Sequence, residues 1–182
     1  LGLMETYEDA VRVIYALFAE KVPGRADFWK QLAAEERGHA KMIAKLRAIA
    51  AEGGLGVENC AAKAAAVGRA VEAARLRMED IAQNGVSPIR SLAMAQEMET
   101  AMNEARFFGH FTTAVSEAED ILDELRESTE EHARRISDLA RRRGKYSALV
   151  DRGIITEEQL EAALRAAAEK GAGVEPLLQT TL

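Results

Sequence analysis

Four long stretches of this chain each carry an apolar seam with alternating spacings of three and four residues, the pattern of helices that pack in a bundle. Polar or ionisable residues interrupt every seam near its middle. Burying an unpaired carboxylate costs several kcal/mol, whereas a whole domain is stable by only about 5–15 kcal/mol. The sequence therefore predicts a helical bundle whose interior holds charged groups that something must neutralise.

Carboxylates and histidines make up most of these interruptions. In chain order, the seams are broken at Glu8, Glu36, His39, Glu97, Glu104, Thr129 and His132. No lysine or arginine lies on the central part of a seam to balance the four carboxylates, whereas two divalent cations would balance them charge for charge. Carboxylate oxygen combined with imidazole nitrogen suits iron or manganese better than soft-ligand metals. We therefore expect two iron ions, with manganese or zinc as alternatives, bound by Glu8, Glu36, His39, Glu97, Glu104 and His132.

Proline, glycine and helix-capping residues divide the chain into expected helices. The seam helices are expected at 3–22, 27–52, 88–111 and 116–143, joined in the middle by an alanine-rich helix at 58–83. Gly144 is the expected end of the last seam helix. These elements predict an all-α fold, a four-helix bundle with a long helical crossover between its second and third helices.

Several motifs along these helices resemble a known family. Residues 32–40 read LAAEERGHA, in which Glu36 and His39 form a Glu-x-x-His unit on one helix face, one turn apart. In the preceding helix, Glu8 lies seven residues before Tyr15. The second half of the chain carries corresponding motifs, AQEME at 95–99 with Glu97 and TEEHA at 129–133 with His132. By these motifs, residues 1–143 resemble the rubrerythrin-type ferritin-like domain.

This resemblance implies a bridged di-iron centre in a ferritin-like bundle. Glu8 and Glu97 would be carboxylate ligands from single helices, and Glu36 would be a bridge. His39 and His132 would each supply one nitrogen ligand to a metal. The implied activity is of the ferroxidase, peroxidase or iron-handling kind.

Two features depart from the family pattern. Thr129 stands where the family has the glutamate of its second Glu-x-x-His unit, which removes one expected carboxylate. Glu104 is the candidate substitute, because helical side chains lean toward the N-terminus and it lies about 10.5 Å beyond Glu97 along the axis. The chain also has a single cysteine, Cys60, and so lacks the cysteine-rich rubredoxin-like module of full-length rubrerythrins. Any electrons would then come from a separate electron-donor protein.

Residues 145–182 differ in character and are expected to form a small helical appendage to the metal-binding domain at 1–144. TEEQ at 156–159 is a capping-box pattern that opens a short helix ending at Gly171. Residues 149–164 resemble part of the N-terminal domain of type II secretion and type IV pilus assembly ATPases, where some copies bind partner proteins and others a cyclic dinucleotide. The turn at 171–176 lacks the arginine of nucleotide-binding copies, so we expect a dimerisation or interaction arm and a homodimer.

Composition excludes other classes of function. The net charge is −6 with no dominant basic face, so nucleic acid is not an expected partner. No apolar run approaches the roughly 20 residues that span a bilayer, so no membrane association is expected. Acidic residues interrupt the N-terminus early, unlike a signal peptide, and the cytoplasm is the expected location.

A second hypothesis keeps the bundle without the metal. The polar core would then be a hydrogen-bonded network in a degenerate scaffold, and the protein would be a non-catalytic adaptor acting through residues 145–182. Tyr15 and Trp29 are expected to be packing aromatics, and the glutamates outside the predicted ligand set to be solvated. The latter are Glu35, Glu99, Glu130 and Glu131.

Overall fold

The structure, a computed structural model, describes residues 1–57, 60–104 and 107–170. Its elements are α1 (Gly2–Lys21), η1 (Pro23–Arg25), α2 (Ala26–Ala51), β1 (Gly56–Val57), α3 (Cys60–Asn84), α4 (Pro88–Glu104), η2 (Phe107–His110), β2 (Phe111–Thr112), α5 (Ser116–Asp151) and α6 (Glu157–Lys170). The predicted all-α class is confirmed, since the only strands in these ranges are β1 and β2.

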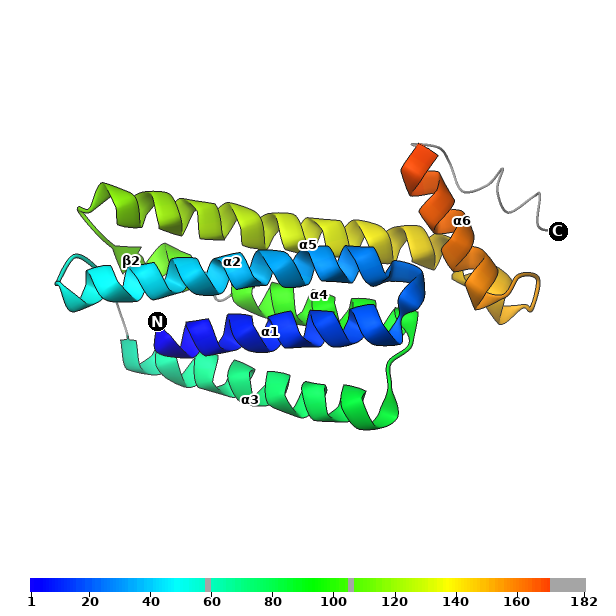
Figure 1. Cartoon of the computed structure of the whole chain (residues 1–182), viewed down its shortest axis with the longest axis horizontal. Coiled ribbons are helices and arrows are strands. Elements are labelled where there is room, and N and C mark those ends of the chain that lie inside the picture. Colours follow the sequence, from blue (N-terminus) through cyan, green and yellow to red (C-terminus); the bar gives the residue numbers. More distant parts are fainter. Residues whose placement is uncertain (58–59, 105–106, 171–182) are drawn as a thin grey trace.

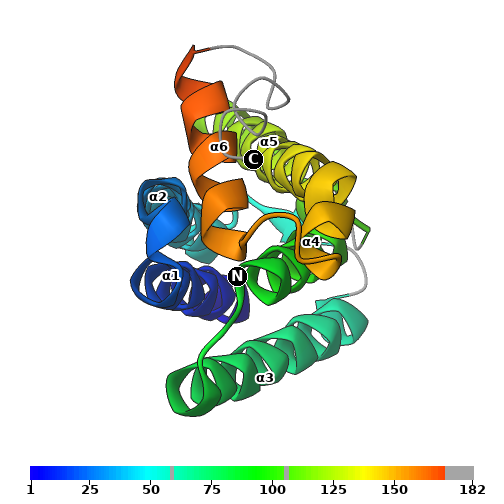
Figure 2. The ribbon, with the colours of Figure 1, turned by 90° about the vertical axis from the view of Figure 1, so that its right-hand side faces the viewer.

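The long helices run side by side (Figure 1). Seen along their axes, α1, α2, α4 and α5 surround a common interior, while α3 lies outside them (Figure 2). α1 packs against α2 and α3, α4 packs against α5, and α2 also contacts α5. α3 connects α2 with α4, where the sequence predicts a helical crossover. The chain thus folds as two helical hairpins, α1–α2 and α4–α5, joined by α3.

Aromatic side chains fill the interior near the η1 end of α1 and α2. Trp29, Tyr15 and Phe18 are fully buried. The Trp29 ring stacks on Tyr15 with centroids 5.5 Å apart and meets Phe18 edge-on at 4.9 Å. These rings fix the packing of α1 on α2 in the turns next to the predicted ligands.

Two helix ends differ from the sequence prediction. The helix expected at 88–111 ends at Glu104 and is followed by the η2 turn. The helix expected to stop at Gly144 continues to Asp151, so that prediction is wrong. Gly153, with φ of +67°, is the residue that ends α5: its N–H bonds to the Val150 carbonyl, and the next N–H bonds to Leu149.

The end of α5 and α6 form a second, smaller apolar cluster. Tyr146 of α5 packs with Ile155 and with Leu160, Ala163, Leu164 and Ala167 of α6. Thr156 and Gln159 exchange hydrogen bonds between backbone and side chain at the start of α6, which confirms the predicted capping box. The proposed boundary at 144/145 therefore falls inside a continuous helix that supports α6.

Across the ranges that the structure describes, no helix combines the length and the apolarity needed to cross a bilayer.

A close turn links the end of α2 to the β1–β2 pair. Gly53, with φ of +79°, lies just after the helix, and the N–H of Gly54 bonds to the Ile49 carbonyl at 3.0 Å. The Gly54 carbonyl accepts a hydrogen bond from the Thr113 hydroxyl at 2.6 Å. A Cβ at residue 54 would lie 2.7 Å from Cγ2 of Ile49 and 3.0 Å from Cγ2 of Val115. The turn therefore requires glycine at position 54.

We expect Gly54→Ala to lower the free energy of unfolding by about 1–3 kcal/mol, because the added methyl group forces this packed turn apart. Gly68→Ala is the matched control: a Cβ there meets nothing within 4 Å, and we expect it to raise stability by about 0.5–1 kcal/mol. Urea unfolding followed by circular dichroism measures both. Equal stabilities of the two variants would contradict the packing described at Gly54.

Candidate metal centre

Two helices bring a carboxylate and two imidazoles together in the interior. Glu36 and His39 project from α2, and His132 projects from α5. One potential ligand atom from each residue can be chosen so that all three lie within 4.8 Å of one another. All three side chains are buried, so water does little to neutralise the Glu36 charge.

The Glu36 carboxylate lies between the two histidines. Its Oε2 is 2.8 Å from Nδ1 of His39, and its Oε1 is 3.0 Å from Nδ1 of His132. The two imidazole rings are 5.1 Å apart, centroid to centroid. Each carboxylate oxygen therefore faces one histidine, and Glu36 is shared by both.

A further glutamate lies beside each histidine. Glu8 of α1 places its Oε2 3.9 Å from Nδ1 of His39. Glu99 of α4 places its Oε1 3.7 Å from Nδ1 of His132. Both glutamates are buried. The cluster thus has two similar halves, Glu8 with His39 and Glu99 with His132, on either side of Glu36.

Outer contacts hold the ligand candidates in orientation. Nε2 of His39 lies 2.7 Å from the Ser128 hydroxyl, and Nε2 of His132 lies 2.8 Å from Glu35. Arg135 donates to the same Glu35 oxygen at 2.7 Å. Because these contacts hold the Nε2 atoms on the side away from Glu36, the Nδ1 atoms face Glu36. Partners of this kind fix the tautomer and the ring angle of metal-binding histidines.

Tyr15 is both a packing aromatic, as expected, and a hydrogen-bond donor to the cluster. Its hydroxyl donates to Oε1 of Glu99 at 2.5 Å. Burial and the nearby Glu99 charge raise the pKa of Tyr15 well above its usual value. Tyr15 therefore keeps its proton and holds Glu99 toward the interior.

Two opposing effects set the ionisation of the cluster: burial disfavours the charged forms, and close contacts between opposite charges favour them. Burial disfavours the Glu36 carboxylate, but its contacts with His132 and His39 outweigh burial and lower its pKa to about 2. Burial likewise disfavours the His132 imidazolium, but Glu36 and Glu99 outweigh it and raise the pKa to about 10. Burial and the Glu36 charge raise the pKa of Glu8 well above its usual value. Without metal, the cluster is neutralised by protons.

Four of the six predicted ligands meet in this cluster: Glu8, Glu36, His39 and His132. Glu97 does not, and its predicted place on the inner seam is wrong: its side chain is 66% exposed and pairs with Arg77 of α3 at 2.9 Å. The inward glutamate of α4 is Glu99, which was expected to be solvated. The side chain of Glu104 lies outside the described residues.

The seam of α4 explains the error at Glu97. The buried residues of this helix include Leu92, Ala95 and Glu99, a three–four spacing that competes with the predicted seam through Met94 and Glu97. Glu97 and Glu99 are two residues apart, which corresponds to a rotation of about 200° around the helix axis. When Glu99 faces the interior, Glu97 therefore faces outward. The Leu92 seam was the signal that would have identified Glu99.

Sequence reasoning also missed the outer contacts. Glu35 was expected to be solvated, but its side chain is 30% exposed and lies between His132 and Arg135. Ser128 precedes Thr129 and was not singled out. Neither contact obeys a local pattern, because each joins α2 to α5 across the bundle.

Thr129 offers no ligand in the observed rotamer. Its hydroxyl donates to the Leu125 carbonyl at 2.7 Å, one turn back in α5. It lines a cavity of about 10 Å³ beside Glu8, Glu36, His39 and Glu99, roughly the space that one water molecule needs. The shorter side chain thus leaves a small opening next to the shared carboxylate.

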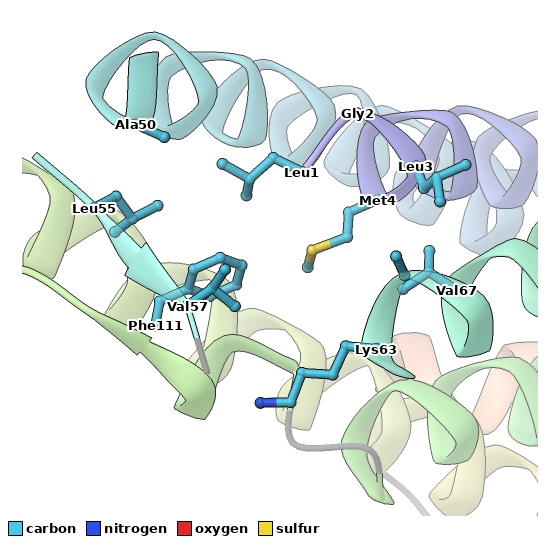
Figure 3. A pocket seen from close by; sticks show the side chains of 11 residues that line it. Leu1, Gly2, Leu3, Met4, Ala50, Leu55, Val57, Lys63, Val67 and Phe111 are labelled. Carbon is cyan, nitrogen blue, oxygen red and sulfur yellow. The ribbon is translucent and has the colours of Figure 1, made fainter. Parts of the chain in front are cut away.

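A larger pocket at the N-terminal end of α1 is of a different kind. It has a volume of about 290 Å³ and is lined by apolar side chains such as Leu1, Met4, Val57 and Phe111 (Figure 3). Lys63 supplies the only charged side chain among the lining residues. Without carboxylates or imidazoles, this pocket is not a candidate for the metal.

We expect chelator-treated protein to lose about 2 kcal/mol or more of unfolding free energy as pH rises from 6.5 toward 10. The folded protein holds the His132 proton more tightly than the unfolded chain does. The contribution of the His132 proton to the free energy of unfolding is therefore fully present below pH 6.5 and is lost as pH rises through about 10, the pKa of His132 in the folded protein.

Urea unfolding of the original protein and of His132→Asn at several pH values isolates this contribution. The free energy of unfolding should decline less steeply with pH in the variant. His110→Asn is the control and should keep the original slope. Identical slopes for all three proteins would refute the assigned ionisation of His132.

Comparison with protein-family models, curated proteins and solved structures finds no match to this chain. The resemblance of residues 1–143 to rubrerythrin-type domains therefore stays a hypothesis. The geometry offers a buried set of three carboxylates and two imidazoles from four helices, which is a candidate metal centre by its own donor chemistry.

Proposed function

We propose that this chain is a ferritin-like di-iron carboxylate protein that binds iron between α1, α2, α4 and α5. The observation that carries the proposal is the Glu36 carboxylate, shared by His39 and His132, each with its own additional glutamate. Glu8, Glu36 and His39 would hold one ion, and Glu36, Glu99 and His132 the other. Manganese or zinc could occupy the same donors.

The donor set fits divalent cations. Nδ1 of His132 is buried and has no aligned hydrogen-bond partner, although it faces Glu36 and Glu99. A buried nitrogen between two carboxylates is suited to a cation that binds all three. Metal would replace the protons that otherwise neutralise the cluster, so binding should release protons.

Bound iron would supply the one-electron chemistry needed to reduce dioxygen or peroxide. Alternatively, iron would be the cargo that is oxidised. The chain contributes orientation and exclusion of water. Ser128 and Glu35 fix the two imidazoles, Tyr15 holds Glu99, and the buried aromatics seal the site on the Trp29 side. The cavity beside Thr129 would admit a small molecule next to Glu36.

Thr129 makes the proposed centre different from the family pattern. Among the described residues, the donor set has three carboxylates, Glu8, Glu36 and Glu99, where the family pattern has four; the fourth would come from the position of Thr129. Glu8, Glu36 and Glu99 would therefore be the carboxylates that hold the metal, with His39 and His132. On the sequence arguments, the proposal also includes an external electron-donor protein, a homodimer and a cytoplasmic location.

The test is the metal content of protein purified from iron-supplemented cells. We expect at least about one iron per chain, and in Glu99→Gln a loss of half or more, because that change removes a charged ligand. Glu97→Gln is the matched control on the same helix and should keep the original content, since Glu97 is exposed.

Metal content below about 0.2 ions of iron, manganese or zinc per chain, with no uptake on reconstitution, would refute the proposal. Equal losses in Glu97→Gln and Glu99→Gln would refute the assignment of Glu99 while leaving metal binding intact. Stopped-flow oxidation of added Fe(II) by dioxygen then separates a ferroxidase from a protein that only binds metal.

A further inference from the structure

A cavity of about 450 Å³ lies where η1, α5 and α6 meet, away from the metal centre residues. α6 sits at the end of the bundle where α1 passes into α2 (Figure 1). Four arginines line this cavity: Arg25 from η1, Arg135 and Arg142 from α5, and Arg165 from α6. Its volume falls in the usual range of small-molecule sites.

Arg25 is the buried cation of this cavity. Its side chain is only 9% exposed, and its ion-pair partner is Glu161 of α6, 2.6 Å from Nε. Neither Nε nor Nη2 of Arg25 has an aligned hydrogen-bond acceptor. Buried guanidinium groups normally have their donors satisfied, so Arg25 has donors left for a further acceptor.

Glu161 lines the same cavity, and it also serves a second buried arginine; neither of its carboxylate oxygens has an aligned hydrogen-bond donor among the described residues. Oε1 of Glu161 lies 3.4 Å from Nε of Arg143, whose side chain is 5% exposed. Arg143 has Glu157 as an additional partner. Within this network, Arg25 therefore shares its carboxylate and has no second one.

Arg165 adds another positive charge close by. A Cβ at Gly24 would lie 3.5 Å from Nη2 of Arg165, so the guanidinium lies over the glycine that precedes Arg25. Burial lowers the pKa of Arg25; Glu161 opposes this, while the charges of Arg143 and Arg165 lower it further. Neither Arg142 nor Arg165 has an ion-pair partner among the described residues.

The acidic residues at the rim are directed to other cations. Asp138 pairs with Arg141 at 2.7 Å and with Arg134 at 3.6 Å. Asp27 is fully exposed and lies 3.9 Å from Lys30. Four arginines and three acidic residues, Asp27, Asp138 and Glu161, line the cavity, which leaves one positive charge in excess. Arg25 pairs with Glu161, and Arg135 pairs with Glu35. Arg142 and Arg165 are therefore the cations open to a ligand.

We propose that this cavity binds a small oxyanion, a phosphate or carboxylate group carried by a molecule with an apolar body. Guanidinium groups match the geometry of both oxyanions through paired N–H donors. Phe28, Leu139 and Leu164 give the cavity apolar walls for the rest of the molecule. The bound anion would join η1 to α6. One lining residue, Arg135, also pairs with Glu35 beside His132, while none of the proposed metal ligands lines the cavity.

Calorimetric titration of the full chain at low ionic strength tests this with phenyl phosphate, benzoate and the uncharged benzyl alcohol. We expect saturable 1:1 binding of at least one of the two anions and none of the alcohol. Tighter binding of phenyl phosphate would identify a phosphate site, and tighter binding of benzoate a carboxylate site.

Variants locate the binding. Arg165→Gln and Arg142→Gln should each weaken it about fivefold or more, because each removes a cation from the cavity. Arg126→Gln is the matched control, an exposed arginine of α5 outside the cavity, and should leave affinity unchanged. Protein treated with a chelator should bind the anion equally well, which separates this site from anions held by bound metal.

Absence of saturable binding by both anions would overturn the proposal. So would equal affinities in Arg165→Gln, Arg142→Gln and Arg126→Gln, since the charge change is the same and only its place differs. Circular dichroism of each variant confirms that it is folded.

Discussion

The Glu36 carboxylate, buried between two imidazoles, is the interaction on which the rest of the interior depends. It is held on both sides by His39 and His132, at 2.8 and 3.0 Å. A carboxylate in an apolar core would be strongly destabilising without such partners, and each partner in turn requires its own orientation. Ser128, Glu35 and Tyr15 supply this orientation from three helices. The polar residues around Glu36 therefore form one connected set.

The part of this set that could be predicted from sequence is the part that lies within single helices. Glu36 and His39 are one turn apart in α2, so their proximity follows from helix geometry. The inward faces of α1 and α5 were also read correctly, which placed Glu8 and His132. Glu97 was misplaced because α4 carries two competing seams, and contacts with other helices, Tyr15 of α1 and His132 of α5, select the one through Glu99. Glu35 and Ser128 depend on the spacing between helices, which no local pattern encodes.

A similar competition explains the misplaced end of α5. Gly144 was read as a terminator, but glycine inside a helix costs only about 1 kcal/mol, and the residues beyond it also decide where the helix ends. Continuing the helix buries Arg143 against Glu157 and Glu161 and packs Tyr146 on α6. Tertiary contacts outweighed a local signal, and the last turns of α5 became the support of α6.

The crossover α3 has a consequence for how the centre is assembled. It separates the donors into two sets along the chain, one within residues 2–51 and the other within 88–151. The first hairpin holds Glu8, Glu36 and His39. The second holds Glu99 and His132, but the carboxylate between the two histidines, Glu36, belongs to the first. In the proposed metal-bound state, affinity on the His132 side would depend on the docking of one hairpin on the other and not on helix formation alone. A cation bound at Glu36 would therefore hold the two hairpins together.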